Sequence, residues 1–505
     1  MKPTDNTCTH NVSFRVSRLA ICSFWAVALG VCFFLPGFAS ADDLNSNQAA
    51  TGPTLAFGPV TEYDNGVQTA VAAHRSGLFI EFHQTQTLGD QTIWYRLGRI
   101  DGSNVVWGRS QKSGLYGYWP TAAISREGYV LVVVGNKMSK NGSQLYYQVG
   151  KIDPYGGVDQ SLAWLTQGIH WDAGFHARVA MNDSGLIVGV HETGHSSTGM
   201  YYRVGHFLNP TGGDFTIRWD SGQSGVYYND GINPHIALNN RNQIVAVHQV
   251  PGDNLLHYWR GTVSNGRIQF AASRRYHNNA KESAVVLLDN GVVLEAHVNV
   301  FSIRKDVVVT IGILRPNDPA LIEWGSSHEL FFASYTDLAY PALATDGAEI
   351  LLTFGESASA TSELRNAVGR ISYANGTLIR GSNEKVYVLL NEYRYHIPNP
   401  ATFDALGYQW DKILRFYDDE INIIPEGAPF PVVAPKSGPL NYPNGTLIRG
   451  VIADKVYVVL NNHRHWIPDP ATFDAMGYDY DKILRLNDSK LNAIPEGGRF
   501  PSVAR

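Results

Sequence analysis

The sequence has 505 residues, a formal net charge of −5 and 11% aromatic residues. Its mildly acidic balance argues against nucleic acid or an anionic membrane surface as the partner. The many glycines and aromatic residues, with few helical patterns, favour a mainly β protein, and the length suffices for one large core plus smaller units.

Residues 1–41 have the layout of a cleavable signal peptide, and residues 42–54 form a linker. Arg15 and Arg18 precede a long apolar stretch that ends at Ala39-Ser40-Ala41. We therefore expect an exported chain, secreted or held at the cell surface, with no membrane span in its mature form. An uncleaved membrane anchor is the alternative, because the apolar run is nearly long enough to cross a bilayer.

The cysteines all lie within this leading segment, as Cys8, Cys22 and Cys32. The rest of the chain therefore cannot form a disulfide or a cysteine-ligated metal site. Its stability must come from a large packed core.

From residue 55 onward a strand–turn–strand pattern recurs six times, as in "IALNNRNQIVAVHQ" and "RVAMNDSGLIVGVHE". The turns recur every 49 to 57 residues, at Gly77, Gly128, Gly185, Asn242, Gly291 and Gly347. A third strand with a glycine follows each pair, and then a strand that carries an aromatic residue such as Trp107 or Trp219. Such a period suits one four-stranded propeller blade.

The sixth repeat lacks its fourth strand, and "LAFG" at Leu55–Gly58 matches the missing piece. An N-terminal strand that completes the last blade removes the open edges of the sheet ring. We therefore predict a six-bladed β-propeller over residues 55–373, closed by its N-terminal strand.

The second strand of four repeats ends on a histidine, at His83, His191, His248 and His297; Val134 and Thr353 stand at the other two places. The connections between blades come out on the same rim and carry Asp64, Asp172, Tyr228, Asn229 and Asp230. Three interpretations remain open: the histidines hold the rim together, they bind a metal, or they form ligand pockets with these neighbours. Histidine, Asp/Asn and Tyr suit sugar hydroxyls. A shared metal is disfavoured, because ring-related strand ends lie roughly 10 Å apart whereas metal–nitrogen bonds measure about 2.1 Å.

Signals for catalysis are sparse. Glu81 and Glu295 are weak candidates for the carboxylate pair of a glycosidase, and each has an ordinary alternative as a strand residue or an arginine partner. Arg96 and Arg203 recur at equivalent places, and we interpret them as salt-bridge residues between blades. No phosphate loop, nucleophile elbow or metal-binding helix motif occurs in the sequence.

The C-terminal residues form two near-copies, 374–433 and 444–505, joined by a Pro/Gly linker at 434–443. Each predicts a strand hairpin and then a short helix that begins with a capping residue and proline, at Asn399 or Asp469. We therefore expect two small α+β modules. Arg394, Tyr395, Arg464 and Trp466 are the candidate contact residues, with a packed hairpin as the alternative.

The propeller pattern resembles secreted bacterial six-bladed propellers of lectin-like architecture, and the paired modules resemble tandem repeats at the ends of secreted and cell-surface bacterial proteins. The resemblance implies a non-catalytic protein that binds glycans or a cell-surface polymer through its rim, with the modules attaching it to a surface. A secreted glycosidase or polysaccharide lyase, and a protein-binding scaffold, are the alternatives. No cofactor and no metal are expected.

Overall fold

The computed structural model describes residues 53–503, except 86–89, 223, 301–305, 316, 331–336, 358–362, 417, 434–441 and 453. The predicted signal segment therefore lies outside the described residues. Among the described helices, none has the length and apolar character needed to cross a membrane.

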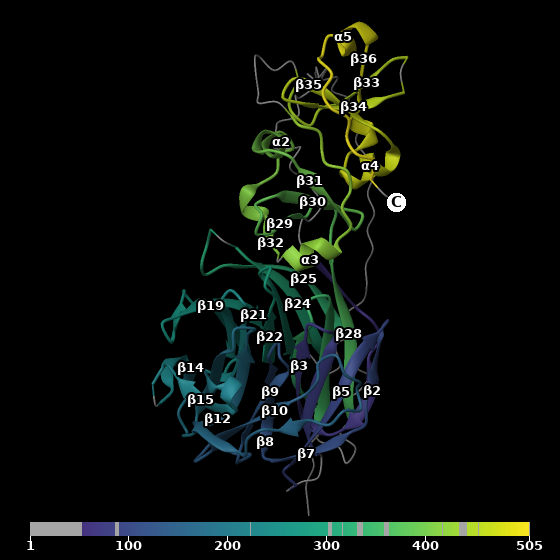
Figure 1. The fold of residues 1–505 in the computed structure, drawn as a ribbon. Helices are drawn as coiled ribbons and strands as arrows, with labels where there is room; N and C mark the ends of the chain where they lie inside the picture. Colours follow the sequence, from purple (N-terminus) through teal and green to yellow (C-terminus); the bar gives the residue numbers. More distant parts are fainter. Residues whose placement is uncertain are drawn as a thin grey trace, which may run out of the picture.

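The larger part of the chain, residues 53–373, is built of antiparallel sheets with one recurring order (Figure 1). A first strand pairs with a second, the second with a third, and the third with a fourth. The first strands are β3 (Val67–His74), β8 (Tyr118–Ile124), β12 (Ile169–Met181), β17 (Ile232–Leu238), β22 (Ala280–Leu287) and β26 (Asp337–Thr345). The second strands are β4 (Leu78–Gln84), β9 (Tyr129–Gly135), β13 (Leu186–Thr193), β18 (Gln243–Gln249), β23 (Val292–Asn299) and β27 (Glu349–Ser357).

The third strands are β5 (Thr92–Asp101), β10 (Gln144–Lys151), β14 (Gly199–Asn209), β19 (Leu255–Ser264), β24 (Asp306–Leu314) and β28 (Glu363–Tyr373). The fourth strands are β6 (Asn104–Trp107), β11 (Ala163–Trp164), β15 (Asp214–Trp219), β20 (Arg267–Phe270) and β25 (Ile322–Leu330), and β1 (Pro53–Phe57) takes this place beside β28. A 3-10 turn at Pro210–Gly212 precedes β15. The N-terminal strand therefore pairs with the last third strand, as the "LAFG" segment predicts.

Short strands in the connections bind back to the preceding sheet. These are β2 (Thr61–Asn65), which pairs with β28, β7 (Gln111–Tyr116), with β5, β16 (Val226–Asp230), with β14, and β21 (Arg274–Asn278), with β19. At the equivalent place β12 itself pairs with β10 through Ile169–Ala173, which joins two of the sheets. Asp172 thus lies within a strand, whereas the sequence placed it in a connection.

Both faces of the second strands are buried. Their apolar face packs between neighbouring sheets, as Val188 and Val190 do against Tyr202 and Ile236. The opposite face carries Glu81, Gly189, Ala246 and Glu295, and these residues are also buried. The histidines belong to this second face, so they lie inside the molecule rather than on an open rim.

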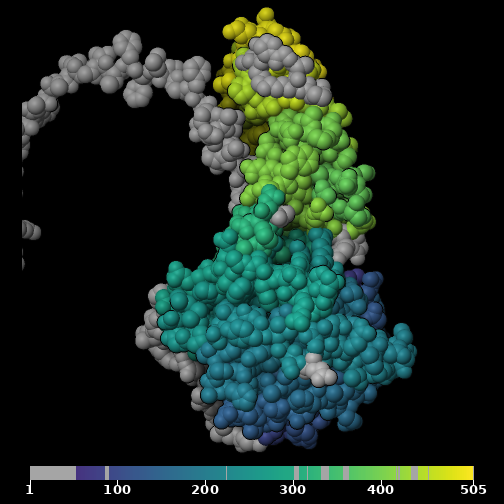
Figure 2. All heavy atoms as spheres, turned by 90° about the vertical axis from the view of Figure 1, so that its left-hand side faces the viewer, coloured from purple at the N-terminus to yellow at the C-terminus, as the bar shows by residue number. Residues whose placement is uncertain are grey.

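The two C-terminal modules stand on one end of the β body (Figure 1, Figure 2). The first contains β29 (Leu378–Arg380), β30 (Val386–Leu390), β31 (Tyr393–Ile397), α2 (Pro400–Ala405), a 3-10 turn (Trp410–Lys412), β32 (Leu414–Arg415) and α3 (Asp418–Ile423). The second repeats it as β33 (Leu447–Gly450), β34 (Val456–Leu460), β35 (His463–Ile467), α4 (Pro470–Ala475), a 3-10 turn (Tyr480–Lys482), β36 (Leu484–Leu486) and α5 (Asp488–Asn492).

The caps of α2 and α4 form as the sequence predicts. The Asn399 side chain accepts a hydrogen bond from Thr402 N at 2.7 Å, and Asp469 accepts one from Thr472 N at 2.8 Å. Each cap satisfies a helix N–H that has no partner within the helix.

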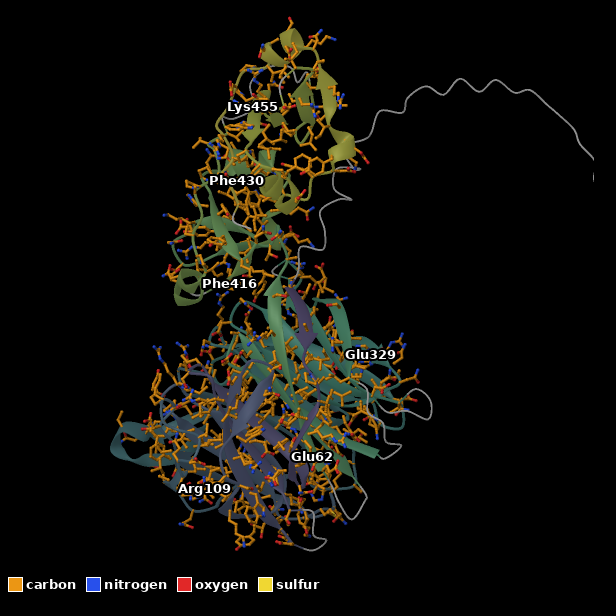
Figure 3. The ribbon with its side chains drawn as sticks, turned by 90° about the vertical axis from the view of Figure 1, so that its right-hand side faces the viewer. Glu62, Arg109, Glu329, Phe416, Phe430 and Lys455 are labelled. Atoms are coloured by element: carbon orange, nitrogen blue, oxygen red, sulfur yellow. The ribbon has the colours of Figure 1, made fainter. Side chains whose placement is uncertain are left out.

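Specific contacts fix the first module to the β body. Arg241 Nη2 donates to Arg415 O at 2.9 Å, and Lys412 Nζ lies 3.3 Å from Glu323 Oε2. Phe416 lies at this junction, and Phe430 lies between the two modules (Figure 3), where its ring meets Phe500 edge to face at 5.0 Å. Arg241 belongs to the turn between a first and a second strand, so the modules cover the turn end of the sheets.

Candidate functional site: the mouth of the axis

The four repeated histidines are buried. His83, His191 and His297 are 2% exposed and His248 is 1% exposed. Their rings therefore lie in the interior and do not form open pockets for a glycan on the rim.

Three of these rings are each packed against a glycine, and this close approach explains their burial. A Cβ built on the glycine would lie 2.6 Å from the ring for Gly66 and His83, 2.4 Å for Gly174 and His191, and 2.7 Å for Gly231 and His248. Such contacts are closer than carbon atoms tolerate, so a larger residue would push the ring away. The histidine therefore fills the space that the glycine of the incoming connection leaves.

In the first repeat His83 belongs to a charged cluster. Its Nδ1 lies 3.0 Å from Oε2 of the fully buried Glu81, and its Nε2 lies 4.0 Å from Asp64 Oδ2. Arg96 Nε lies 3.2 Å from the same Asp64 oxygen, and Arg96 also donates to Tyr63 O. Burial lowers the pKa of His83, but the charge and hydrogen bond of Glu81 and the charge of Asp64 outweigh burial and raise the pKa above its ordinary value.

The fifth repeat has a related cluster with other residues. Tyr276 Oη donates to Glu295 Oε1 at 3.0 Å, and His297 Nδ1 lies 2.9 Å from Glu295 Oε2. The ring of His277 lies 4.2 Å from that of His297 between centroids. Glu295 is fully buried, as Glu81 is. Each carboxylate thus bonds a histidine of its own strand, and neither has an exposed face for an acid–base role.

In the third repeat His191 donates from Nδ1 to Glu192 O at 2.8 Å, and its Nε2 lies 3.5 Å from Asp172 Oδ2. Arg203 Nη1 lies 3.6 Å from the same oxygen and donates to Trp171 O at 2.5 Å. Burial raises the pKa of Asp172, but the His191 bond and charge and the Arg203 charge outweigh it, so the pKa is lowered. The recurring arginines form salt bridges to the incoming connection, as predicted.

In the fourth repeat Asn229 Nδ2 lies 3.5 Å from His248 Nε2. Burial, helped by His257, lowers the pKa of His248 to about 3, so this ring is neutral at physiological pH. Tyr228 stacks on Phe270 instead, and the exposed Asp230 accepts from Thr198 Oγ1 at 3.1 Å. In the first, third and fourth repeats the structure therefore brings each histidine together with one predicted connection residue, which is Asp64, Asp172 or Asn229.

The candidate contact residues of the tail are also mostly enclosed. Arg394 and Arg464 are buried and each donates to a backbone carbonyl, Ile421 O and Leu491 O. Tyr395 is buried. Trp466 reaches the surface, with Lys455 and Arg499 over its ring at 4.4 and 4.5 Å from the centroid. Arg394, Tyr395 and Arg464 are therefore packed inside their hairpins, and Trp466 is the one of the four that reaches the surface.

The six first strands surround a common central axis, because each one contacts the next and all six line one cavity. A second group of residues lies around this axis, near the bulges of the first strands. Every first strand has a β-bulge near its start. One residue of each bulge has a positive φ without being glycine: Gln68 (57°), Trp119 (57°), His176 (46°), Asn233 (51°), Glu282 (55°) and Tyr340 (34°). Such a backbone costs about 1–3 kcal/mol for each residue and recurs at functional sites. We call these six residues the mouth ring.

Three aromatic members of the mouth ring meet over the axis. The ring centroid of Trp119 lies 4.3 Å from that of His176 and 4.7 Å from that of Tyr340, and His176 and Tyr340 are 5.8 Å apart. Trp119 and Tyr340 come from strands that are not neighbours, because β3 separates β8 from β26. Trp119 and Tyr340 are half-buried, whereas the His176 side chain is only 11% exposed.

Side chains bind the free N–H groups of the bulges. Gln68 Oε1 accepts from Trp119 N at 2.8 Å, and Glu282 Oε2 from Tyr340 N at 3.4 Å. A β-bulge leaves an N–H outside the ladder, and a buried N–H needs a partner. Each acceptor here comes from the preceding first strand, so the mouth ring is tied together around the axis.

Glu192, at the end of β13, ties two further ring members. Its Oε1 accepts from Asn233 N at 2.9 Å and lies 2.9 Å from His176 Nδ1, while its Oε2 lies 2.7 Å from Lys140 Nζ. Burial raises the pKa of Glu192, but the bonds to His176, Lys140 and Asn233 outweigh burial and lower it. Glu192 is therefore an ionised carboxylate at the edge of the aromatic cluster.

An axial cavity of about 220 Å³ lies between the first strands, β3, β8, β12, β17, β22 and β26. Its ionisable lining residues are Arg178 and His235, and no carboxylate lines it. Burial, together with the charge of Arg178, lowers the pKa of His235 to about 3, which makes this ring neutral. Burial lowers the pKa of Arg178 to about 10, so the guanidinium keeps its charge.

Arg178 donates to Ala177 O at 2.8 Å, and the described residues that line the cavity around it include no carboxylate, although the charge of Glu192 reaches it from outside the lining. A buried cation is stable only where an anion or a hydrogen-bond acceptor meets it. The axis therefore combines a positive interior with an aromatic mouth.

At the opposite end of the first strands, turn residues of neighbouring sheets are joined by hydrogen bonds and an ion pair. Asn240 Nδ2 donates to Asp183 at 3.2 Å and to Asp289 at 2.9 Å, and Arg75 pairs with Asp183. The C-terminal modules stand on this end. The mouth ring lies at the other end of the first strands.

The six residues of the mouth ring share no residue type, so a repeated sequence pattern does not reveal them. The available signal was positional: each member lies two residues before the point where the regular pairing of its first strand resumes. The strained backbone that distinguishes these residues cannot be read from that position alone.

No family model matches this chain, and no curated protein matches it. Among solved structures, it is similar to a protein of unknown function from Dyadobacter fermentans at 10% identity and a TM-score of 0.43, which covers 63% of this chain and 99% of that one. A sialidase from Trypanosoma rangeli is similar at 11% identity and a TM-score of 0.41, over 63% of this chain and 60% of that one. An α-L-arabinanase from Penicillium chrysogenum is similar at 10% identity and a TM-score of 0.40, over 63% and 97%. At these values the likeness assigns neither a ligand nor an activity to this chain.

Proposed function

We propose that this chain is an exported six-bladed β-propeller, closed by β1, that binds an acidic glycan at the mouth of its axis. The ligand is placed at the mouth ring rather than at the four histidines, because those rings are 1–2% exposed, whereas Trp119 and Tyr340 are half-buried. The C-terminal modules hold the opposite end and would attach the protein to a surface.

The observation that carries the proposal is the aromatic cluster beside a buried cation. Trp119, His176 and Tyr340 offer ring faces, against which the apolar face of a sugar stacks. Asn233 lies at the same edge and offers side-chain oxygen and nitrogen atoms to hydroxyl groups, while the buried Glu192 holds its backbone N–H. Arg178 lines the axial cavity, whose described lining includes no carboxylate, so it favours a ligand that brings its own anionic group.

Glycan-array binding with acidic and neutral glycans tests the proposal. Arg178→Gln should weaken binding of acidic glycans at least about tenfold, since a hydrogen bond to a charged group contributes about 1.5–3 kcal/mol. Neutral glycans should be unaffected by this change, whereas Trp119→Ala should weaken both classes. Arg109→Gln is the matched control, because it removes the same charge from the exposed surface. A folded chain without glycan binding, or equal binding by Arg178→Gln, would contradict the proposal.

Glycoside hydrolysis is the second candidate. It is favoured by the two carboxylates whose charges act on Tyr340, Glu282 and Glu192, because a pair of carboxylates is what glycosidases use. The array ligands decide between the two functions when they are incubated with the chain and assayed for new reducing ends. Release of reducing ends that Glu282→Gln abolishes would establish an enzyme, and intact ligands would leave a lectin.

A further inference from the structure

The fifth repeat replaces a salt bridge with a second histidine. In the strand register, Glu81 lies opposite Arg96 on the neighbouring strand, whereas Glu295 lies opposite Thr310. The connection before the first repeat supplies Asp64, and the connection before the fifth supplies His277. The fifth repeat therefore has no arginine at this place, although its carboxylate is as deeply buried as that of the first.

Among the described residues the buried Glu295 carboxylate has no lysine or arginine as an ion-pair partner, and in this it resembles Glu81, which pairs with His83. In the described part of the chain the ion-pair partner of Glu295 is His297, which is charged only when protonated. A fully buried carboxylate is costly unless a cation or several hydrogen bonds compensate it. Tyr276 bonds Oε1, and this leaves Oε2 facing the imidazole side.

We propose that His277, Glu295 and His297 form a binding site for one zinc ion. One potential ligand atom from each residue lies within 4.8 Å of the others. Two imidazole nitrogens and a carboxylate oxygen form a donor set that zinc takes, with bonds of about 2.0–2.2 Å. Tetrahedral ligands at such bonds lie about 3.4 Å apart, so side-chain shifts of about 1 Å close the site.

The position of the three residues gives the ion a mechanical role. His277 belongs to β21, which pairs with β19, whereas Glu295 and His297 belong to β23 of the next sheet. A zinc ion at this site would link two neighbouring sheets. At the equivalent place in the first repeat, the salt bridge between Arg96 and Asp64 links two other sheets. His277 is half-buried, so a water molecule can complete the four ligands from the solvent side. Histidines at the strand ends of different repeats lie too far apart to share a metal ion. His277 comes from a connection instead, and its ring lies 4.2 Å from that of His297 between centroids.

Titration with Co²⁺ and Zn²⁺ tests the site on the purified chain. Cobalt bound in this site should give the intense visible absorption of tetrahedral coordination, which aqueous cobalt lacks, and one equivalent of Zn²⁺ should abolish it. His277→Asn should lower the affinity for this one Zn²⁺ ion, measured by calorimetry, at least about 100-fold. Even residues that only support metal ligands contribute about 10–100-fold to metal affinity. Asparagine is a suitable replacement, because Asn229 occupies the equivalent place in the fourth repeat.

His170→Asn is the control for losing a histidine, because His170 is exposed and lies outside the site. It should keep both the absorption band and the zinc affinity of the wild type. Absence of a tetrahedral cobalt spectrum in the folded wild type would overturn the proposal, even if His277→Asn does not fold. Equal zinc binding by wild type and His277→Asn would also overturn it. Metal binding is measured without a glycan, so either result leaves the function of the mouth to its own test.

Discussion

At the scale of single residues, three of the four repeated histidines are packing partners of a glycine. The incoming connection passes so close to the ring that only glycine fits. The sequence allowed the strand, the face and the end of the strand to be predicted for these histidines. Their burial could not be predicted, because it depends on a backbone approach from a different part of the chain.

The glycine–histidine contact can be tested with Gly174→Ala. The added Cβ would lie 2.4 Å from His191 Nδ1 and 2.7 Å from Leu145 Cδ1, so ring and leucine must both move. Overpacking of this kind costs about 1–3 kcal/mol of unfolding free energy, measured by urea denaturation. Gly168→Ala is the control, because no atom lies within 4 Å of its Cβ and it should stay near the wild-type value. Equal stability of the two variants would show that the ring is not confined.

The neutral His248 predicts a pH dependence of stability. Its folded pKa of about 3 is below the unfolded value of about 6.5, so the unfolded chain binds the extra proton between these values. Stability is therefore retained above pH 6.5 and decreases as the pH falls toward 3. Between pH 7 and pH 5 this group accounts for about 2 kcal/mol of unfolding free energy. His248→Gln should reduce the loss by that amount in urea denaturation at the two pH values. Parallel losses in wild type and variant would contradict the assignment.

At the scale of elements, the bulge is the feature that builds the candidate site. The sequence predicted the first strands, because their alternation and turns recur. It did not predict the bulges, because a bulge shifts the alternation by one residue in a short strand and the six residues involved differ in type. The acceptors of the freed N–H groups differ too: they are Gln68, Glu192 and Glu282.

Glu192→Ala should loosen one bulge and spare another. It removes the acceptor of Asn233 N, so hydrogen exchange at the start of β17 should speed up, as followed by mass spectrometry of peptides. Trp119 N keeps its Gln68 acceptor and is the internal control at the start of β8. Loss of this buried acceptor and of its pairs with Lys140 and His176 should also cost about 3 kcal/mol of stability. Uniformly faster exchange at both strands would mean that Glu192 supports the whole fold rather than this bulge.

At the scale of the whole molecule, local repeats predicted more than long-range docking. The missing fourth strand of the last repeat indicated the pairing of β1 with β28. The placement of the C-terminal modules on the turn end could not be predicted, since it depends on single contacts such as Arg241 with Arg415 and Lys412 with Glu323. Charged surface residues of this kind carry no period that a sequence pattern could detect.

The proposed closure of the ring by β1 can be tested on the intact chain. Thr54 and Ser372 lie directly opposite each other on β1 and β28, and their hydroxyl oxygens are 2.9 Å apart. Cysteines at these positions are close enough to form a disulfide. The bridge would join residues 318 positions apart, and constraining so long a loop in the unfolded chain stabilises by about 2–4 kcal/mol.

The experiment uses Thr54→Cys with Ser372→Cys in a chain without residues 1–41, where all the natural cysteines lie. The oxidised double variant should unfold at a higher temperature than its reduced form, whereas Thr54→Cys alone should show no such difference. If β1 closes the ring, tying it down must delay the unfolding of all the sheets together, so one cooperative transition should move. A disulfide that forms without moving this transition would show that the sheets are stable without β1, and the propeller would then be open at this point.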